Sequence, residues 1–569
     1  MTRQQPRNHR RAAACLALLV ACLETIVPAQ ERSAPRFFED DPIARVPESQ
    51  DASGVQAREI SLAFDAITNL FGRPGLPIVG RAGNVNTIDE VPDSSWYTNR
   101  TELTASGIER GVNEDRGPAP GLWAVSGKAD GVSAGFTVTD VRGKRYFVKF
   151  DPPGEPELGT GAEAVATRLF HALGYFVPQA NVVTLRREDL VVANGATVRQ
   201  LGGKRRPMRP SDIDEVLERA ERNPDGTYRV IVTEGLAGVR LGGFTYIGTR
   251  PDDPNDVVPH ENRRELRGLR VFSAWLNHTD AKALNSLDMR VTENGRTRVR
   301  HHLIDFNAAL GSAGIGVRER RDGYEYLAEF GPALRAIPAF GFYIRPWMTV
   351  KYPKFRGIGR FEAERFAAEL WRPRVPNPAY VRSRPDDTFW GARKLMALPE
   401  EIIRAAVKAG RYSDPESERY LIEALLERRS KIARAFLVPI NPVVDPQLSS
   451  DGRLVFGNAA VEHAGARAPS SYRATWHRFD NASGVLTSLG STEGPASGLP
   501  APAGLPTEPG AFARVDISTA ESPHPSWSSP VHAYFRRLPG GWKLVGFERL
   551  PDAPPMRPGL VGAEPMPEE

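Results

Sequence analysis

The sequence predicts an α+β protein with a two-lobed core, an antiparallel strand-rich lobe followed by a helical lobe, and then a small all-β domain. Short runs of alternating apolar and polar residues between residues 122 and 151 are separated by turns that contain Gly or Asp, as in antiparallel strands. From residue 260 to about 437 apolar residues recur at helical spacing. After residue 446 the short alternating runs return. A chain of 569 residues is too long for one core, which favours several domains.

The N-terminus has the order of an export signal. A basic head precedes an apolar run from Ala12 to Leu23, which is too short to span a bilayer. Cleavage after Ala29 would make residues 1–29 a signal peptide. Alternatively, residues 19–22 resemble a bacterial lipobox, so that residues 1–21 would be removed and Cys22 would carry a lipid. We therefore expect an exported protein, either periplasmic or anchored in the cell envelope through Cys22, with no other membrane contact.

Cysteine and charge content exclude several classes of function. Both cysteines, Cys15 and Cys22, lie in the leader, so the mature chain has no disulfide and no cysteine nucleophile. The formal net charge is +5, but Arg3, Arg7, Arg10 and Arg11 belong to the leader. The mature chain is therefore nearly neutral, and we expect no nucleic-acid partner.

Composition divides the mature chain into four parts. Residues 30–117 form an N-terminal extension without recognisable chemistry, in which residues 57–71 are expected to be helical. The core is expected over 118–440, with its first lobe at about 118–250 and its second at about 251–440. A β-sandwich-like domain is expected over 446–550, and the Pro-rich residues 551–569 are expected to be disordered.

Within the first lobe, strands are expected over 121–131, 133–141 and 144–151, and again over 179–185 and 228–236. A helix is expected between them. Thr160 and Glu163 have the spacing of a capping box, and Gly174 would end the helix. In the second lobe, helices are expected over 261–277, 398–410 and 414–437, the last with Asp414 as its N-cap.

Several residues in these elements have the chemistry that phosphoryl transfer requires. That reaction needs phosphates and metal held in place and a carboxylate near the attacking hydroxyl. In chain order the candidates are a turn with Gly127 and Gly131, Lys149 on the third strand, Glu163 on the next helix, Asp280, Lys282 and Asn285 in "HTDAKALN", and Asp305 at the end of the apolar strand "HLIDF".

From about Leu122 to Leu437 this order resembles the protein-kinase-like superfamily, particularly its atypical branches. "LNHTDAKALN" is close to the HipA pattern Asn-Thr-Asp-Asp-His-Leu-Lys-Asn. The Asp-(x)4-Asn spacing is similar to that of phosphoinositide kinases and of secreted Fam20- and CotH-type kinases. The resemblance implies a two-lobed kinase-like fold that uses ATP or another nucleotide with Mg²⁺ or Mn²⁺.

The resemblance also implies a role for each candidate. Lys149 would bind the α- and β-phosphates and pair with Glu163, and the turn with Gly127 and Gly131 would cover the phosphates. The remaining residues would act at the transferred group.

Asp280 would orient or deprotonate the acceptor, and Lys282 would neutralise the γ-phosphate. Asn285 and Asp305 would ligate the metal through oxygen atoms.

The sequence departs from the kinase pattern in three places. Residues 127–131 do not spell Gly-x-Gly-x-x-Gly, Asp305 is followed by Phe306-Asn307 instead of Phe-Gly, and no Ala-Pro-Glu ends an activation segment. A regulated eukaryotic-type protein kinase is therefore not expected.

Structural roles compete with the functional ones. Glu163 could serve only in the capping box, Lys149 could lie on an exposed strand edge, and Asp280 and Asn285 could cap a helix and fill a turn. Asp386 and Asp387 are expected to be partners of a helix N-terminus. Of His301 and His302, adjacent on a strand, at most one can join a site.

Three functions follow. The first is an exported kinase-like phosphotransferase acting on an unknown protein, lipid or glycan acceptor. The second is a kinase-like pseudoenzyme that binds a nucleotide, metal or partner in the envelope, and the third is an unrelated α+β binding protein. The export signal bears on this choice because ATP is expected to be scarce outside the cytoplasm.

Overall fold

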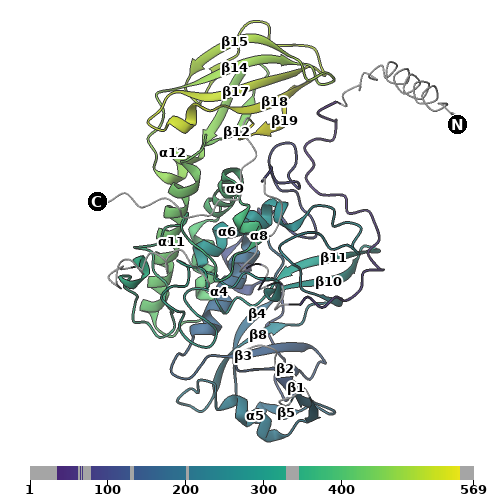
Figure 1. The fold of residues 1–569 in the computed structure, drawn as a ribbon, viewed down its shortest axis with the longest axis vertical. Coiled ribbons are helices and arrows are strands. Elements are labelled where there is room, and N and C mark those ends of the chain that lie inside the picture. Colours follow the sequence, from purple (N-terminus) through teal and green to yellow (C-terminus); the bar gives the residue numbers. More distant parts are fainter. Residues whose placement is uncertain are drawn as a thin grey trace, which may run out of the picture.

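A computed structural model describes residues 35–61, 65, 67, 69, 79–128, 133–199, 204–327 and 345–551. Figure 1 shows three stacked parts: a strand-rich lobe at the bottom, a helical lobe in the middle and an all-β domain at the top. The predicted α+β architecture is confirmed. The predicted leader with Cys15 and Cys22, the glycine Gly131, and residues 552–569 lie outside the described residues.

The first lobe is built on a six-stranded sheet in the order β4-β8-β3-β2-β1-β5. All neighbours are antiparallel except the parallel pair β1–β5. The predicted meander of the first three strands is confirmed. The strands are β1 (Trp123–Lys128), β2 (Gly135–Thr139), β3 (Arg145–Phe150), β4 (Ala180–Leu185), β5 (Leu190–Val192) and β8 (Tyr228–Glu234).

Helices cover the two faces of this sheet. On one face, α5 (Pro210–Leu217) contributes Ile213 to a core with Val148 and Val232. On the other, α4 (Leu158–Ala172) packs Ala164 against Ile231. Because neighbouring strand residues point to opposite faces, Lys149, which pairs in register with Ile231, lies on the face that α4 covers.

Helix α4 begins differently from the prediction. It starts at Leu158 and has no cap from its own N-cap side chain. The buried carboxylate of Asp151 accepts hydrogen bonds from the backbone N–H groups of Gly159 and Thr160, both at 2.8 Å, and from the Thr160 hydroxyl at 2.7 Å. The predicted capping box is therefore wrong, because Asp151 already binds these N–H groups, and Glu163 is left for another role.

The second lobe combines helices with a three-stranded sheet in the order β11-β10-β9. Its helices are α6 (Arg264–Leu276), α8 (Pro378–Val381), α9 (Pro385–Met396), α10 (Glu400–Lys408) and α11 (Pro415–Leu437). Its strands are β9 (Val239–Gly242), β10 (Ser286–Glu293) and β11 (Arg296–Leu303). Asp414 caps α11 as predicted, accepting from the backbone N–H of Glu416. No helix within the described ranges is long and apolar enough to cross a membrane.

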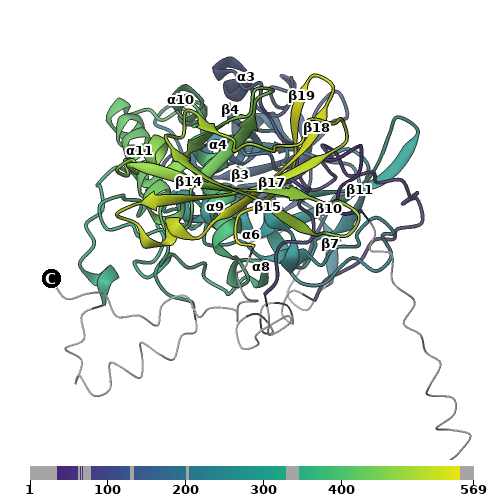
Figure 2. The same cartoon turned by 90° about the horizontal axis from the view of Figure 1, so that it is seen from above.

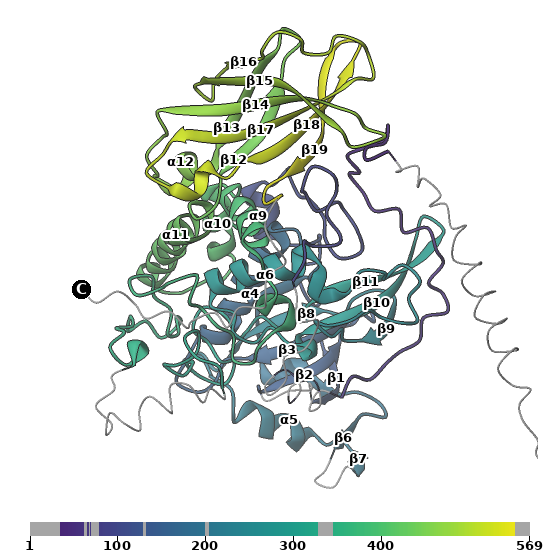
Figure 3. The same ribbon diagram turned by 45° about the horizontal axis from the view of Figure 1, so that its top comes forward.

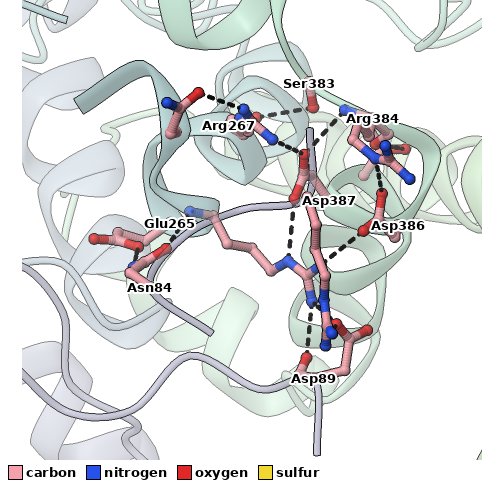
Figure 4. Close-up of polar contacts among 12 residues, drawn as sticks. Asn84, Asp89, Glu265, Arg267, Ser383, Arg384, Asp386 and Asp387 are labelled. Carbon is pink, nitrogen blue, oxygen red and sulfur yellow. Dashed lines mark hydrogen bonds and ion pairs between the residues drawn. The ribbon is translucent and has the colours of Figure 1, made fainter. Parts of the chain in front are cut away.

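Helix α6 is buried on every side, so its arginines need partners inside the protein. Arg264 donates to Asp386 at 2.9 Å and to Asp387 at 3.1 Å, and Arg267 donates to Asp387 at 3.2 Å (Figure 4). Asp386 and Asp387 lie in the first turn of α9, as predicted. Arg264 also pairs with Asp89 at 2.8 Å, which ties the N-terminal extension to both helices.

The N-terminal extension is part of the folded structure. Trp96 and Tyr97 belong to the core of the helical lobe, and the short helix α3 (Ala105–Arg110) packs near α10. Figure 3 shows the purple segment passing from the all-β domain along the side of the β9–β11 sheet. At its start, Phe37 packs against Phe479 and Tyr534 of the last domain.

The C-terminal domain contains a five-stranded antiparallel sheet in the order β15-β14-β17-β18-β19 and a three-stranded sheet in the order β12-β13-β16. The larger sheet spreads across the top of the molecule (Figure 2). Its last two strands form an antiparallel hairpin. The elements are β12 (Val443–Leu448), β13 (Arg453–Asn458), α12 (Ala459–Ala464), β14 (Ser471–Phe479), β15 (Leu486–Gly494), β16 (Leu499–Pro500), β17 (Phe512–Glu521), β18 (Val531–Leu538) and β19 (Gly541–Glu548).

Candidate active site

Lys149 and Glu163 form an ion pair inside the first lobe. Lys149 lies on the α4-facing side of β3, and Glu163 is one turn into α4. Lys149 Nζ lies 3.0 Å from Glu163 Oε2, and the Glu163 side chain is only 3% exposed. The Thr233 hydroxyl on β8 donates to Glu163 Oε1 at 3.3 Å. Lys149 is therefore not an exposed edge residue, and Glu163 is held from two sides.

Asp305 connects this pair to the second lobe. It follows β11 and has a φ of 63°, a left-handed conformation that is uncommon outside glycine. Its Oδ1 lies 2.8 Å from Lys149 Nζ, while its side chain remains 41% exposed. One ammonium group thus contacts a carboxylate from each lobe.

The pKa values of Lys149 and Glu163 are both shifted from their ordinary values. Burial alone would lower the pKa of the Lys149 ammonium, but the carboxylates of Asp305 and Glu163 outweigh burial and raise this pKa above its ordinary value. Burial and the charge of Asp305 raise the pKa of Glu163, although Lys149 opposes the shift. Lys149 therefore stays charged at neutral pH.

Asp280, Lys282 and Asn285 form a second cluster in the loop after α6. Lys282 Nζ lies 2.8 Å from Asp280 Oδ1. The Asn285 amide donates to the Asp280 backbone carbonyl at 2.8 Å and to Asp280 Oδ2 at 3.0 Å. Burial would raise the pKa of Asp280, but the Lys282 charge and its hydrogen bond hold it below its ordinary value. Asp280 is therefore an ionised, oriented carboxylate.

The β10–β11 hairpin places the two clusters next to each other. Ser286 is opposite Leu303 in the antiparallel register, so Asn285 and Asp305 flank the same end of the hairpin. The backbone N–H of Ile304 donates to the Asn285 carbonyl at 3.0 Å. The six described polar residues predicted for the site therefore form two adjoining groups, Lys149–Glu163–Asp305 and Asp280–Lys282–Asn285.

Aromatic rings that the sequence did not indicate support this site. Phe306 stacks on Phe170 of α4 with ring centroids 4.7 Å apart, and His278 lies 5.5 Å from Phe306. Burial lowers the pKa of His278 to about 4, so its imidazole is neutral at physiological pH. His278 and Phe306 are neighbours of selected residues in the sequence, and this adjacency was the available signal. Thr233, which orients Glu163, had no such signal.

The residues present fit a hard divalent cation when phosphates supply the other ligands. Among the described residues, no group of three or more His, Cys, Asp or Glu side chains is arranged to hold a metal. Asp305 and Asn285 would contribute a carboxylate and an amide oxygen, and Mg²⁺ typically takes one or two carboxylates with phosphate and water oxygens for the rest.

The structure does not test the phosphate-covering role predicted for Gly127 and Gly131. Gly127 lies in β1 opposite Thr137, next to a register shift. The nearest atom to a Cβ at this position would be the Thr197 carbonyl oxygen at 3.6 Å, which leaves room for a side chain. Gly131 lies outside the described residues. Phosphate covering by these glycines stays a prediction.

Comparison with known proteins returns solved kinase structures. A Helicobacter pylori proinflammatory kinase, CtkA, is similar over 54% of this chain and 92% of its own, with a TM-score of 0.29 and 12% identity. The Golgi casein kinase with Mn/ADP bound is similar over 56% of this chain and 72% of its own, with a TM-score of 0.27 and 11% identity. No family model and no curated protein sequence matches the chain.

Proposed function

We propose that this protein is a metal-dependent phosphotransferase that uses ATP or another nucleotide. The observation that carries the proposal is the position of Lys149, whose ammonium joins Glu163 of the first lobe at 3.0 Å and Asp305 of the second at 2.8 Å. A fixed cation beside a partly exposed carboxylate is suited to hold nucleotide phosphates together with a metal. A purely structural ion pair would not require the exposed third partner.

In this proposal the phosphates bind against Lys149, and Glu163 keeps the Lys149 side chain extended toward them. Asp305 and Asn285 would hold Mg²⁺ or Mn²⁺, which would neutralise phosphate charge when bound. Because Glu163 is itself fixed by Thr233 and by burial, the ammonium is positioned before the nucleotide arrives.

Asp280 accepts the proton of the attacking hydroxyl while a bond forms between that oxygen and the γ-phosphorus. The bond from the γ-phosphorus to the bridging oxygen breaks, and the nucleoside diphosphate leaves with its electron pair. Lys282, at 2.8 Å from Asp280, stabilises the negative charge of the transferred group.

A second candidate function is that of a kinase-like pseudoenzyme that binds nucleotide or metal without transfer. It is favoured by the contacts of Asp280, whose two carboxylate oxygens are engaged by Lys282 and Asn285. A carboxylate used in this way supports the loop whether or not it also accepts a proton.

The compartment and the acceptor belong to the proposal as well. The leader-like N-terminus supports export to the periplasm or envelope, where the enzyme would need its own nucleotide supply or another donor. Protein hydroxyls, lipid headgroups and glycans remain candidate acceptors, because acceptor recognition depends on surfaces without a short motif.

The two candidates separate in a transfer assay. The purified protein is incubated with γ-labelled ATP, with Mg²⁺ or Mn²⁺ or with a chelator, together with envelope protein, lipid and glycan fractions. Metal-dependent labelling of one fraction supports the phosphotransferase. Metal-dependent nucleotide binding without label in any fraction supports the pseudoenzyme, and the absence of both contradicts each of them.

A further inference from the structure

A cavity lies beside the linker that joins the two lobes, residues 235–238 between β8 and β9. It has a volume of about 770 Å³, within the range of about 300–1,000 Å³ typical of small-molecule sites. Its walls come from the linker and the start of β9, from residues 176–179 between α4 and β4, and from the β10–β11 hairpin. Figure 3 shows β8 and β9 near this hairpin. None of the described residues predicted for the active site lines this linker cavity.

Arg300 lines the linker cavity, and Glu293 is the side chain paired with its guanidinium among the described residues. Arg300 lies over the Phe176 ring at 4.8 Å and donates to Glu293 at 2.6 Å. Its Nε is buried and has no hydrogen-bond partner among the described residues. Glu293 lies on an exposed hairpin end, so an incoming anion can replace it without burying a new charge.

The charges around the linker cavity favour an anion. Arg290 also lines it, and its Nη1 donates to the backbone carbonyls of Ser53 and Val55 at 2.6 and 2.7 Å, not to a carboxylate. Glu234 also lines it and pairs with Lys144 at 2.6 Å, and Lys144 pairs with Asp115 as well. Among the described residues no carboxylate is paired with Arg290, so its positive charge adds to the attraction of a negative group.

The remaining wall is apolar. Phe176, Val177, Leu236, Val239 and Val291 line the linker cavity. Burial lowers the pKa of His302, also in the wall, to about 4, so it adds no charge at neutral pH. A ligand with one charged end and one apolar body would match both parts of this surface.

We propose that the linker cavity binds a small amphipathic organic anion, with its carboxylate, sulfonate or phosphate group on Arg300 and its apolar body against Phe176, Val177 and Val239. Such a ligand touches both lobes, because residues 176–179 belong to the first and the hairpin to the second. The proposal does not depend on phosphoryl transfer.

The test uses two probes that differ in one charged group. The anion 8-anilinonaphthalene-1-sulfonate and the uncharged N-phenyl-1-naphthylamine share their ring systems. Each is titrated into the purified protein, and binding is measured by the probe's fluorescence. We expect one saturable site for each probe. Arg300→Ala should weaken binding of the sulfonate at least about tenfold, because it removes a hydrogen bond to a charged group, and should leave the uncharged probe nearly unchanged.

Two further variants locate the site. Val239→Trp, which fills the cavity from a strand position, should abolish binding of both probes. Arg404→Ala, which removes an exposed arginine paired with Glu400 on α10, should change neither. Circular dichroism checks that Arg300→Ala is folded. Arg300→Gln is measured in parallel, so that the test still holds if Arg300→Ala has a folding defect.

Three results would overturn the proposal. The first is non-saturable binding of the sulfonate. The second is binding that Val239→Trp leaves intact, which would place the probe elsewhere. The third is an equal loss of both probes in folded Arg300→Ala or Arg300→Gln, which would show that Arg300 does not recognise the anion.

Discussion

Lys149 and Asp305 belong to different lobes, yet Lys149 Nζ and Asp305 Oδ1 lie 2.8 Å apart. The same Lys149 nitrogen lies 3.0 Å from Glu163 Oε2. The strand positions of the two residues explain why their side chains meet. Lys149 faces α4 because Val148 faces the opposite core, and Asp305 is placed where the β10–β11 hairpin ends. The relationship predicts that Lys149 matters for both stability and phosphate binding.

Substituting Lys149 alone should lower the free energy of unfolding more than substituting Lys149 and Glu163 together. Lys149→Met leaves Glu163, which is almost fully buried, without its cation. We expect a loss of about 3 kcal/mol in the free energy of unfolding, since one partner of a buried pair is removed. Adding Glu163→Gln should recover part of that loss. Chemical denaturation of both single variants and the double variant gives the coupling energy.

The matched control is Lys408→Met, because Lys408 pairs with Glu109 at the surface. It should change the free energy of unfolding by no more than about 1 kcal/mol. Strict additivity of Lys149→Met and Glu163→Gln would show that the two side chains do not interact as the structure indicates.

Asp280→Asn should separate catalysis from nucleotide binding. The proposed proton acceptor is lost, while the Asn285 hydrogen bond to the residue 280 backbone carbonyl can persist. We expect kcat to fall by about 10²–10⁴-fold and the nucleotide dissociation constant to change little. Single-turnover transfer and calorimetric binding measure the two quantities. If this variant transfers phosphate at the original rate, Asp280 is not the base.

The sequence predicts which helices and strands carry the candidate site residues, because the patterns that indicate these elements are local. Alternation places Lys149 on a strand, helical spacing places Glu163 on the next helix, and an apolar run ends at Asp305. In the structure these three residues form one of the two adjoining clusters, and Asp280 and Lys282 belong to the other.

Pairings between distant segments were not predictable in the same way. Thr160 looked like a helix cap, but Asp151, the residue that follows β3, supplies the cap. Arg264 lies in the helix predicted over 261–277, but the sequence does not indicate its partners Asp386 and Asp387, which are far along the chain. Periodicity describes which residues share a face and carries no information about which distant charge meets them.

Stability should fall in mildly acidic solution because of His278. Its pKa is lowered by burial to about 4, against about 6.5 in an unfolded chain. The unfolded state therefore binds a proton first, and stability present above pH 6.5 is lost as the pH falls toward 4. We expect His278→Leu to reduce this loss by roughly 1–3 kcal/mol, measured by denaturation between pH 7.5 and 4.5.

The exposed His463 on α12 provides the comparison. His463→Leu should leave the pH dependence nearly parallel to that of the unsubstituted protein. An unchanged slope in His278→Leu would mean that this imidazole becomes protonated as easily in the folded protein as in the unfolded chain.

Asp387 should contribute far more to the free energy of unfolding than an acidic residue that only interacts with a helix N-terminus. It is fully buried and contacts Arg264 and Arg267 at 3.1 and 3.2 Å. Asp387→Ala leaves these arginines short of a partner, and we expect a loss of about 3–5 kcal/mol in the free energy of unfolding. A helix-dipole role alone would give about 0.3–1 kcal/mol.

Asp445→Asn is the surface counterpart, since Asp445 pairs with Arg393 but its side chain is 72% exposed. Asn is used because residue 445 has a left-handed φ of 50°, which Asn tolerates. The effect on unfolding should be within about 0.5 kcal/mol. Equal effects of Asp387→Ala and Asp445→Asn would contradict a stabilising role for the buried network.

The measurement that tests the central claim most directly is nucleotide binding by the purified protein with and without Mn²⁺, compared with the Asp305→Asn variant. Asp305→Asn removes the proposed carboxylate ligand but keeps its shape. We predict that Mn²⁺ with ATP raises the melting temperature of the unsubstituted protein, that either alone does so much less, and that Asp305→Asn loses the metal-dependent part. A nucleotide-induced shift that is absent in the unsubstituted protein, or equally large in Asp305→Asn, would contradict a metal–nucleotide site at Lys149 and Asp305.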